Sequence, residues 1–221
     1  KEAFAIARSG RPGPILIDIP KDVQAEEYDF IYPEEPVKLP GENPLNKEIC
    51  KKSLDDAADL IANAKRPFIL AGHGILLSGA SKEVIELSEK CDIPLSWTLL
   101  GSGAVPASHD LNMGMMGMHG EFAANNAIQK ADLLIACGMR FDDRVTGDTS
   151  KYAINAKVIH IEIDPSEIDK IIKTEVAINA DAKEALINLI PKIKKKSHEE
   201  WINEFKECDK LEYDKIIDKE I

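Results

Sequence analysis

Two arginines and two aspartates fall within five residues of the segment GMRFDDRVTG, residues 138–147. The chain has five arginines and 23 lysines, so a generic surface cation in it is a lysine. A guanidinium presents a rigid fork of donors that binds phosphates and carboxylates bidentately. Arg140 and Arg144 therefore predict an anion site, with Asp142 and Asp143 orienting them. The alternative is a salt-bridge cluster that braces the loop, although exposed pairs contribute only ~0–1 kcal/mol.

A second unusual segment is NMGMMGMHG, residues 112–120, which holds four methionines and three glycines. We expect neither regular helix nor regular strand there. Methionine is adaptable and polarizable and covers flat rings well, although a Met-rich stripe is more often plain core. The glycines would place the backbone itself against whatever binds there.

Short apolar runs alternate with helical patterns through most of the chain. Strands are expected at residues 67–71, 93–97, 132–137, 157–163 and 174–178, and helices at 46–64, 81–90, 121–130 and 182–195, the last closed by the lysine run 192–196. This alternation predicts the α/β class. The expected fold is a doubly wound, mostly parallel, Rossmann-like sheet with helices on both faces.

The domain organisation is expected to include pieces of neighbouring domains. A helix end and a strand at 15–19 are expected near the start, and prolines at 33, 36, 40 and 44 indicate a linker. The chain has no initial Met, so we expect a piece of a longer protein. The predicted division is residues 1–23 as the tail of a preceding domain, 24–45 as linker, 46–197 as the central domain and 198–221 as a linker with a helix toward a further domain.

Composition excludes several classes of function. The net charge is −11 with no basic face, which argues against nucleic-acid binding. No apolar run approaches the ~20 residues that span a bilayer, so no membrane segment is expected. The four cysteines form no CxxC pair, so no metal site is expected and a reduced, cytoplasmic setting is favoured. Cys137, within an apolar strand, is expected to be a core residue.

In a doubly wound sheet, ligands bind beyond the carboxyl ends of the strands. The loops expected there begin at Gly72, Thr98, Gly138, Glu162 and Asn179. Glu162 stands where an acid accepts hydrogen bonds from ribose hydroxyls, although a lone acid is more often solvated. Asp181 opens a helix and is equally explained as its N-cap. No GxGxxG motif is present, so an ordinary dinucleotide fingerprint is not supported.

Five segments together resemble the catalytic subunit of acetolactate synthase (acetohydroxyacid synthase), a thiamine-diphosphate enzyme of branched-chain amino-acid synthesis. They are GRPGPILIDIPKDVQ, AGHG, NMGMMGMHG, GMRFDDRVTG and IHIEIDPSEIDKI. The resemblance runs from residue 1 to about residue 215. GRPGP with IPKDV is shared widely among thiamine-diphosphate enzymes, whereas GMHG together with RFDDRVTG is highly specific.

The resemblance implies a chain of three α/β domains. The first and third bind thiamine diphosphate and magnesium between subunits, and the middle one binds FAD without net redox in the main reaction. This sequence resembles the middle domain with the tail of the first. It implies no catalytic residue and no metal ligand here.

The resemblance also implies which residues surround the FAD. Arg140 and Arg144 would lie beside its diphosphate and ring system, and Arg11 would reach it from the preceding domain. The remaining implied cofactor-binding residues are Gly72, His73, Gly74, Thr98, Leu99, Leu100, Gly117, Met118, His119, Gly138, Met139, Asp142, Val145, Glu162, Ile163, Asp181 and Ala182. Lys21, Met118 and Arg144 would line the substrate channel.

The implied full-length enzyme joins a two-carbon fragment from pyruvate to pyruvate or 2-oxobutanoate. It would be a homodimer or homotetramer with a small regulatory subunit, and the chain alone would be inactive. One alternative is another FAD-containing thiamine-diphosphate enzyme, of the glyoxylate carboligase or pyruvate oxidase type. Others are a stand-alone nucleotide-binding module, of the electron-transfer or NAD-dependent deacetylase kind, and an interdomain piece without ligand.

Overall fold

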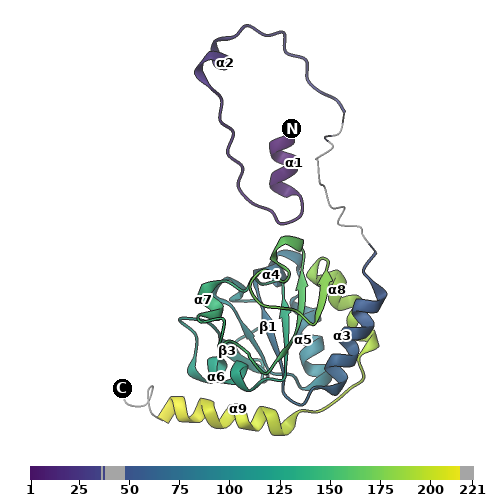
Figure 1. The fold of residues 1–221 in the computed structure, drawn as a ribbon, viewed down its shortest axis with the longest axis vertical. Helices are drawn as coiled ribbons and strands as arrows, with labels where there is room; N and C mark the ends of the chain where they lie inside the picture. Colours follow the sequence, from purple (N-terminus) through teal and green to yellow (C-terminus); the bar gives the residue numbers. More distant parts are fainter. Residues whose placement is uncertain (36, 38–47, 215–221) are drawn as a thin grey trace. The chain divides into compact units, whose positions relative to one another are not determined.

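The structure is a computed structural model that describes residues 1–35, 37 and 48–214 (Figure 1). The chain divides into two units, residues 1–47 and 48–221. Residues 36 and 38–45 of the expected linker lie outside the described residues, as do 46 and 47 of the first expected helix.

The first unit contains two short helices, α1 (Glu2–Arg8) and α2 (Lys21–Ala25). The strand expected at residues 15–19 is not formed: these residues are exposed, and no strand lies within residues 1–35. A strand needs a neighbour to pair its backbone groups, and the described part of this unit supplies none. The prediction of a strand at 15–19 is therefore wrong.

The second unit is built on a six-stranded sheet in the order β3-β2-β1-β4-β5-β6, and its strand pairings are parallel. The strands are β1 (Pro67–Ala71), β2 (Leu95–Trp97), β3 (Asn112–Met115), β4 (Leu133–Cys137), β5 (Lys157–Glu162) and β6 (Val176–Asn179). This is the doubly wound order, whose direction reverses between β1 and β4. The predicted fold class is confirmed.

Helices cover both faces of the sheet (Figure 1). They are α3 (Lys51–Asn63), α4 (His73–Ser78), α5 (Ser81–Cys91), α6 (Phe122–Lys130), α7 (Asp143–Thr146), α8 (Ala182–Leu189) and α9 (Glu199–Glu212), with 3-10 turns η1 (Leu99–Gly101), η2 (Pro165–Glu167) and η3 (Ile190–Lys192). Ile69 and Ile135 pack with α3, α5 and α8, whereas Phe68 and Leu134 pack with α6 and α9. Successive strand residues point to opposite faces, so two buried faces require the continuous apolar runs seen in the sequence.

The segment 112–120 departs from its prediction. Asn112–Met115 forms the edge strand β3, paired with β2 through a shift in register. An edge strand tolerates such an irregularity, and Gly114 adopts a positive φ of 82° within it. Met113 and Met116 are buried in the core, whereas Met118 is exposed. Half of the methionines are thus ordinary core residues.

The last predicted helix is shorter than expected. It ends at Leu189, close to Pro191, which has no backbone N–H to continue the helical pattern. A lysine of the run that follows contacts a different helix. Lys196 Nζ donates to the carbonyl of Ala62, 2.9 Å away, at the end of α3. A cation there satisfies a terminal carbonyl and complements the negative end of the helix dipole.

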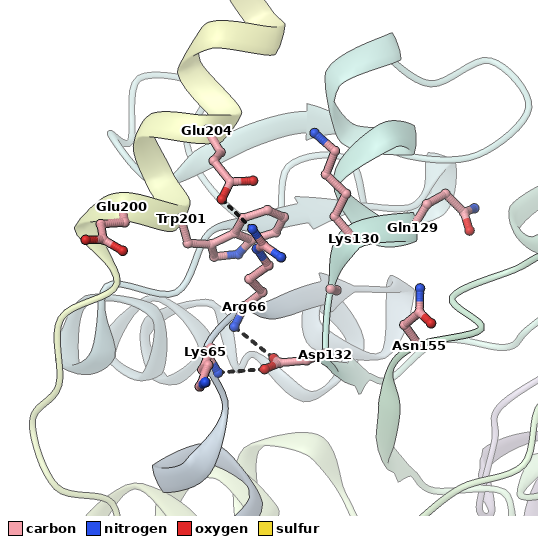
Figure 2. A pocket seen from close by; sticks show the side chains of 10 residues that line it. Lys65, Arg66, Gln129, Lys130, Asp132, Asn155, Glu200, Trp201 and Glu204 are labelled. Carbon is pink, nitrogen blue, oxygen red and sulfur yellow. Dashed lines mark hydrogen bonds and ion pairs between the residues drawn. The ribbon is translucent and has the colours of Figure 1, made fainter.

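Helix α9 lies against the amino ends of β1 and β4 and beside α6 (Figures 1 and 2). Trp201 is 3% exposed, and its Nε1 donates to the carbonyl of Pro67 at 2.9 Å. The Arg66 guanidinium lies 5.8 Å from the Trp201 ring and 2.6 Å from Glu204. Asp132 accepts the Arg66 backbone N–H at 2.8 Å. The helix is therefore anchored by two buried aromatic residues, Trp201 and Phe205, and by the polar contacts around Trp201.

Replacing Trp201 by alanine should lower the free energy of unfolding by about 3–5 kcal/mol, because a buried aromatic side chain and its hydrogen bond are lost. Urea denaturation followed by circular dichroism measures this change. Lys206→Ala, at an exposed position of the same helix, is the control and should change stability little. A Trp201→Ala value as small as that of the control would show that α9 is not docked as described.

His160 is a buried polar residue of β5 that supports the loop after β4. Its Nε2 lies 2.9 Å from the carbonyl of Met139, and since a carbonyl only accepts, Nε2 carries the proton. The Phe141 ring packs edge-on against the imidazole, with centroids 5.0 Å apart. Nδ1 has no hydrogen-bond partner among the described residues. Burial lowers the pKa of His160 below its usual 6.5, so the neutral ring is favoured in the folded chain.

This depressed pKa predicts a pH dependence of stability. The unfolded chain takes up the proton at a higher pH than the folded chain, so this contribution is complete above pH 6.5 and is lost as the pH falls. His160→Gln, which cannot titrate, should show a shallower loss of stability between pH 7 and 5 than the unmodified chain. Urea denaturation at several pH values measures both slopes, and equal slopes would contradict the prediction.

Candidate functional site

The loops after β1 and β4 touch at the point where the strand order reverses. Gly72 N donates to the carbonyl of Cys137 and Gly74 N to that of Gly138, both at 2.9 Å. A Cβ on Gly74 would lie 2.7 Å from the Cα of Gly138, and Gly138 has a φ of +58°. Only glycine fits such an approach without displacing backbone. Two glycine-rich loops therefore meet at the carboxyl edge, where ligands of this fold bind.

The arginine loop lies at this same edge. Asp142 is the N-cap of α7, and its carbonyl accepts the Val145 N–H at 3.0 Å. Arg140 lies 3.7 Å from Asp142, both side chains being 41% exposed. Arg144 directs Nη1 to the sulfur of Met118 at 3.2 Å and forms no ion pair within the described part of the chain. One loose ion pair is not the salt-bridge cluster of the alternative interpretation, and Arg144 is left accessible to an anion.

The methionine–glycine segment is joined to the arginine loop through backbone. Met118 N donates to the carbonyl of Arg144 at 2.8 Å. Gly117 has a φ of +119°, and a Cβ there would lie 2.8 Å from the same carbonyl oxygen. Met116 N donates to the carbonyl of Trp97, which keeps the segment next to β2. These bonds bring together two segments far apart in sequence.

Large apolar side chains are exposed beyond the ends of β2 and β3. Leu99 is 65%, Leu100 67% and Met118 58% exposed. The neighbouring Thr98 is buried, and His73 donates from Nδ1 to the carbonyl of Leu100 at 2.8 Å. Apolar surface of this kind at a ligand-binding edge suits the flat face of an aromatic ring.

The ends of β5 and β6 carry the two acidic candidates. Glu162 is only 5% exposed, so the alternative of a solvated loop acid is wrong. Asn179 Nδ2 bridges the carbonyls of Glu162 and Ile163 at 2.8 and 3.0 Å. Asp181 caps α8, and its Oδ1 accepts the Lys183 N–H at 2.9 Å. The N-cap interpretation of Asp181 is confirmed, whereas its contact with a cofactor stays a prediction.

The structure thus gathers most candidates at one edge of one sheet. They are Gly72, His73, Gly74, Thr98, Leu99, Leu100, Gly117, Met118, His119, Gly138, Met139, Arg140, Asp142, Arg144, Val145, Glu162, Ile163, Asp181 and Ala182. Arg11 and Lys21 belong to the first unit. Sequence reasoning missed Asn125 of α6, which binds both backbone groups of Gly117. No local pattern marks that contact.

Other regions hold fewer indications of chemistry. A cavity of about 600 Å³ lies at the opposite, amino edge of the sheet, lined by Lys65, Arg66, Lys130, Asn155 and Trp201 among others (Figure 2). Among residues 1–35, 37 and 48–214, no cluster of three or more histidine, cysteine or acidic residues is placed to hold a metal ion. Within the same residues, no helix has the length and apolar character needed to cross a membrane.

Cys137 confirms its prediction as a core residue. It is fully buried, and burial raises the pKa of its thiol to about 12. Such a thiol stays protonated and unreactive at neutral pH.

Comparison with known proteins gives the chain its relatives. It is 45% identical over 210 residues to the acetolactate synthase large subunit of Corynebacterium glutamicum, covering 93% of this chain and 33% of that protein. It is 46% identical over 217 residues to a probable acetolactate synthase large subunit of Methanocaldococcus jannaschii, covering 96% and 36%. With the isozyme 1 large subunit of Escherichia coli it shares 43% identity over 200 residues, covering 90% and 34%. The chain spans about a third of the length of these relatives.

The family model that matches is that of the thiamine pyrophosphate enzyme central domain, over residues 54–189. Those residues run from α3 through α8 and contain all six strands of the sheet. The chain therefore belongs to the family of thiamine pyrophosphate enzymes and contains their central domain.

Proposed function

We propose that this chain is the FAD-binding central part of an acetolactate synthase large subunit. The main support is the contact between two exposed side chains, Arg144 and Met118, at the carboxyl edge of the sheet. The names of the relatives support the enzyme. The family supports the thiamine-diphosphate chemistry of the whole protein.

The residues of this edge fit the parts of FAD. Arg140 and Arg144 offer guanidiniums to the diphosphate, and the glycine loops at Gly72–Gly74 and Gly138 let it approach the backbone. Leu99 and Leu100 offer apolar surface to the ring system. The remaining proposed contacts are Arg11, Thr98, Gly117, Met118, His119, Met139, Asp142, Val145, Glu162, Ile163, Asp181 and Ala182, with Lys21, Met118 and Arg144 along the substrate channel.

The chemistry of the whole protein is proposed to lie outside this chain. Thiamine diphosphate with Mg²⁺, held by the other domains, supplies the decarboxylation of pyruvate and the joining of its two-carbon fragment to a second 2-oxo acid. FAD, when bound, serves as a structural cofactor without net redox. The chain's own residues bind and orient it, and none is proposed to be catalytic.

The same proposal covers organisation and partners. Residues 1–23 form the tail of the preceding domain, 24–45 a linker, 46–197 the central domain and 198–221 the connection to a following domain. The full-length enzyme is a homodimer or homotetramer, works with a small regulatory subunit and resides in the cytoplasm.

The chain alone should show no acetolactate synthase activity, because the proposed thiamine-diphosphate sites lie in other domains. Pyruvate consumption is measured with thiamine diphosphate, Mg²⁺ and FAD added, and the E. coli isozyme 1 serves as positive control. Turnover by the chain above the enzyme-free background would contradict this assignment of the chemistry.

Arg144→Ala should weaken FAD binding by about 1.5–3 kcal/mol, the scale of a hydrogen bond to a charged group. Titration of FAD into the chain, followed by quenching of flavin fluorescence, measures the affinity. Lys151→Ala removes a cation at a highly exposed nearby position and should leave the affinity unchanged. Equal binding by Arg144→Ala and the unmodified chain would mean that the arginine loop has only a structural role.

A further inference from the structure

Asn125 of α6 binds the backbone of Gly117 through both ends of its side-chain amide. Its Oδ1 accepts the Gly117 N–H at 3.1 Å, and its Nδ2 donates to the Gly117 carbonyl at 3.0 Å. Because a backbone N–H only donates and a carbonyl only accepts, this pair of contacts fixes the orientation of the amide. Gly117 lies two residues after β3 ends. The Asn125 amide pairs with both of its backbone groups, as a neighbouring strand would, and we call this pair of contacts the clamp.

The clamp acts on the residue that precedes Met118. Met118 N donates to the carbonyl of Arg144, and the Arg144 guanidinium returns a contact to the Met118 sulfur. Gly117 also packs so closely on the Arg144 carbonyl that no Cβ fits between them. Any shift of Gly117 would therefore move Met118 and Arg144, which are both proposed to contact the FAD.

The helix that carries Asn125 is itself held in place by α9. The Glu212 carboxylate accepts the N–H groups of Phe122 and Ala123 at 2.9 and 3.1 Å, which satisfies two of the donors at the start of α6. Asn126, next to the clamp, instead contacts the Cys208 sulfur at 3.3 Å. Asn125 thus lies on a helix whose start is held by α9. Asn126 is of the same residue type but contacts a different partner, so it provides a matched control.

We propose that Asn125 is a positioning residue of the cofactor site: through Gly117 it holds Met118 and Arg144 in the arrangement that receives the flavin. The inference rests on the proposed FAD site and adds to it a residue that touches no ligand. The two hydrogen bonds between Asn125 and Gly117 are part-buried. Loss of the Asn125 side chain therefore leaves the Gly117 N–H without its partner and loosens the loop at residues 116–118.

The first measurement follows the loop without any ligand. Hydrogen–deuterium exchange is compared in the 221-residue chain and its variants Asn125→Ala, Asn125→Asp and Asn126→Ala. Asn125→Asp keeps the size and the acceptor but removes the donor, and it serves should the alanine variant fold poorly. Asn125→Ala should exchange the Gly117 and Met118 amides about tenfold faster or more, the scale of one lost hydrogen bond. Asn125→Asp should also exchange them faster, because its carboxylate repels the Gly117 carbonyl to which the amide had donated. Amides of β1 and β4 and the Asn126→Ala variant should be unaffected.

The second measurement is FAD affinity in the same variants and in the Asn125→Ala/Arg144→Ala double variant. Asn125→Ala should raise the Kd for FAD about tenfold, whereas Asn126→Ala should not. If Asn125 acts through Arg144, the double variant should bind little worse than Arg144→Ala. A purely structural role would give additive effects and faster exchange throughout the sheet.

The outcomes separate the two proposals. Unchanged loop exchange in both Asn125 variants, or equal effects of Asn125→Ala and Asn126→Ala, would overturn the positioning role. Additive losses of FAD affinity would overturn it as well. If the unmodified chain does not bind FAD while the loop loosens as expected, the cofactor assignment fails and the clamp on Gly117 stands.

Discussion

The close approach of the loops after β1 and β4 is the constraint on which the candidate site depends. Two backbones meet there with no room for a Cβ on Gly74, and the bonds from Gly72 and Gly74 to the opposite loop fix their spacing. From this junction the order of the strands runs outward in two opposite directions, β1-β2-β3 and β4-β5-β6. Helices α4 and α7, which follow β1 and β4, therefore lead away from it. A bulky residue at either loop would separate the strands or displace the arginine loop. The geometry of the edge therefore follows from backbone packing rather than from side-chain choice.

The sequence predicted the buried layers of the fold well because the physics behind them is local. Strands β1, β4 and β5 are buried on both faces and therefore appear as uninterrupted apolar runs. Strand β3 was missed because its one glycine and two methionines lack that pattern, and its pairing depends on β2 alone. The apolar run at residues 15–19 carries the pattern of a strand, but the described residues of its unit offer no partner. A pattern of hydrophobicity thus indicates which segments can pair, while the neighbours determine which do.

The candidate site shows the same division. Gly72, Thr98, Gly138 and Glu162 were correctly predicted to lie at one edge, because the end of each strand is visible in sequence and parallel strands end at one edge. Asn125 was not, because its contact joins the middle of α6 to a loop eight residues earlier, and asparagine in a helix has no single expected partner. Helix α8 ends early, close to Pro191, and Lys196 donates to a carbonyl at the end of α3 instead of closing α8. Residues that act through tertiary contacts carry no local pattern that identifies their role.

The two edges of the sheet use arginine in opposite ways, and this contrast bears on which edge receives a ligand. Arg66, at the amino edge, lies 2.6 Å from Glu204 and against the Trp201 ring, so its charge is already balanced and its face covered. Arg144, at the carboxyl edge, has a thioether as its contact, and Arg140 has a half-exposed aspartate 3.7 Å away. Replacing such weak contacts by a phosphate costs little, since exposed pairs contribute only ~0–1 kcal/mol. The Arg66–Glu204 pair is itself part-exposed and also contributes little, but displacing Arg66 would uncover the buried Trp201 ring. The cavity beside Arg66 is therefore the poorer anion site.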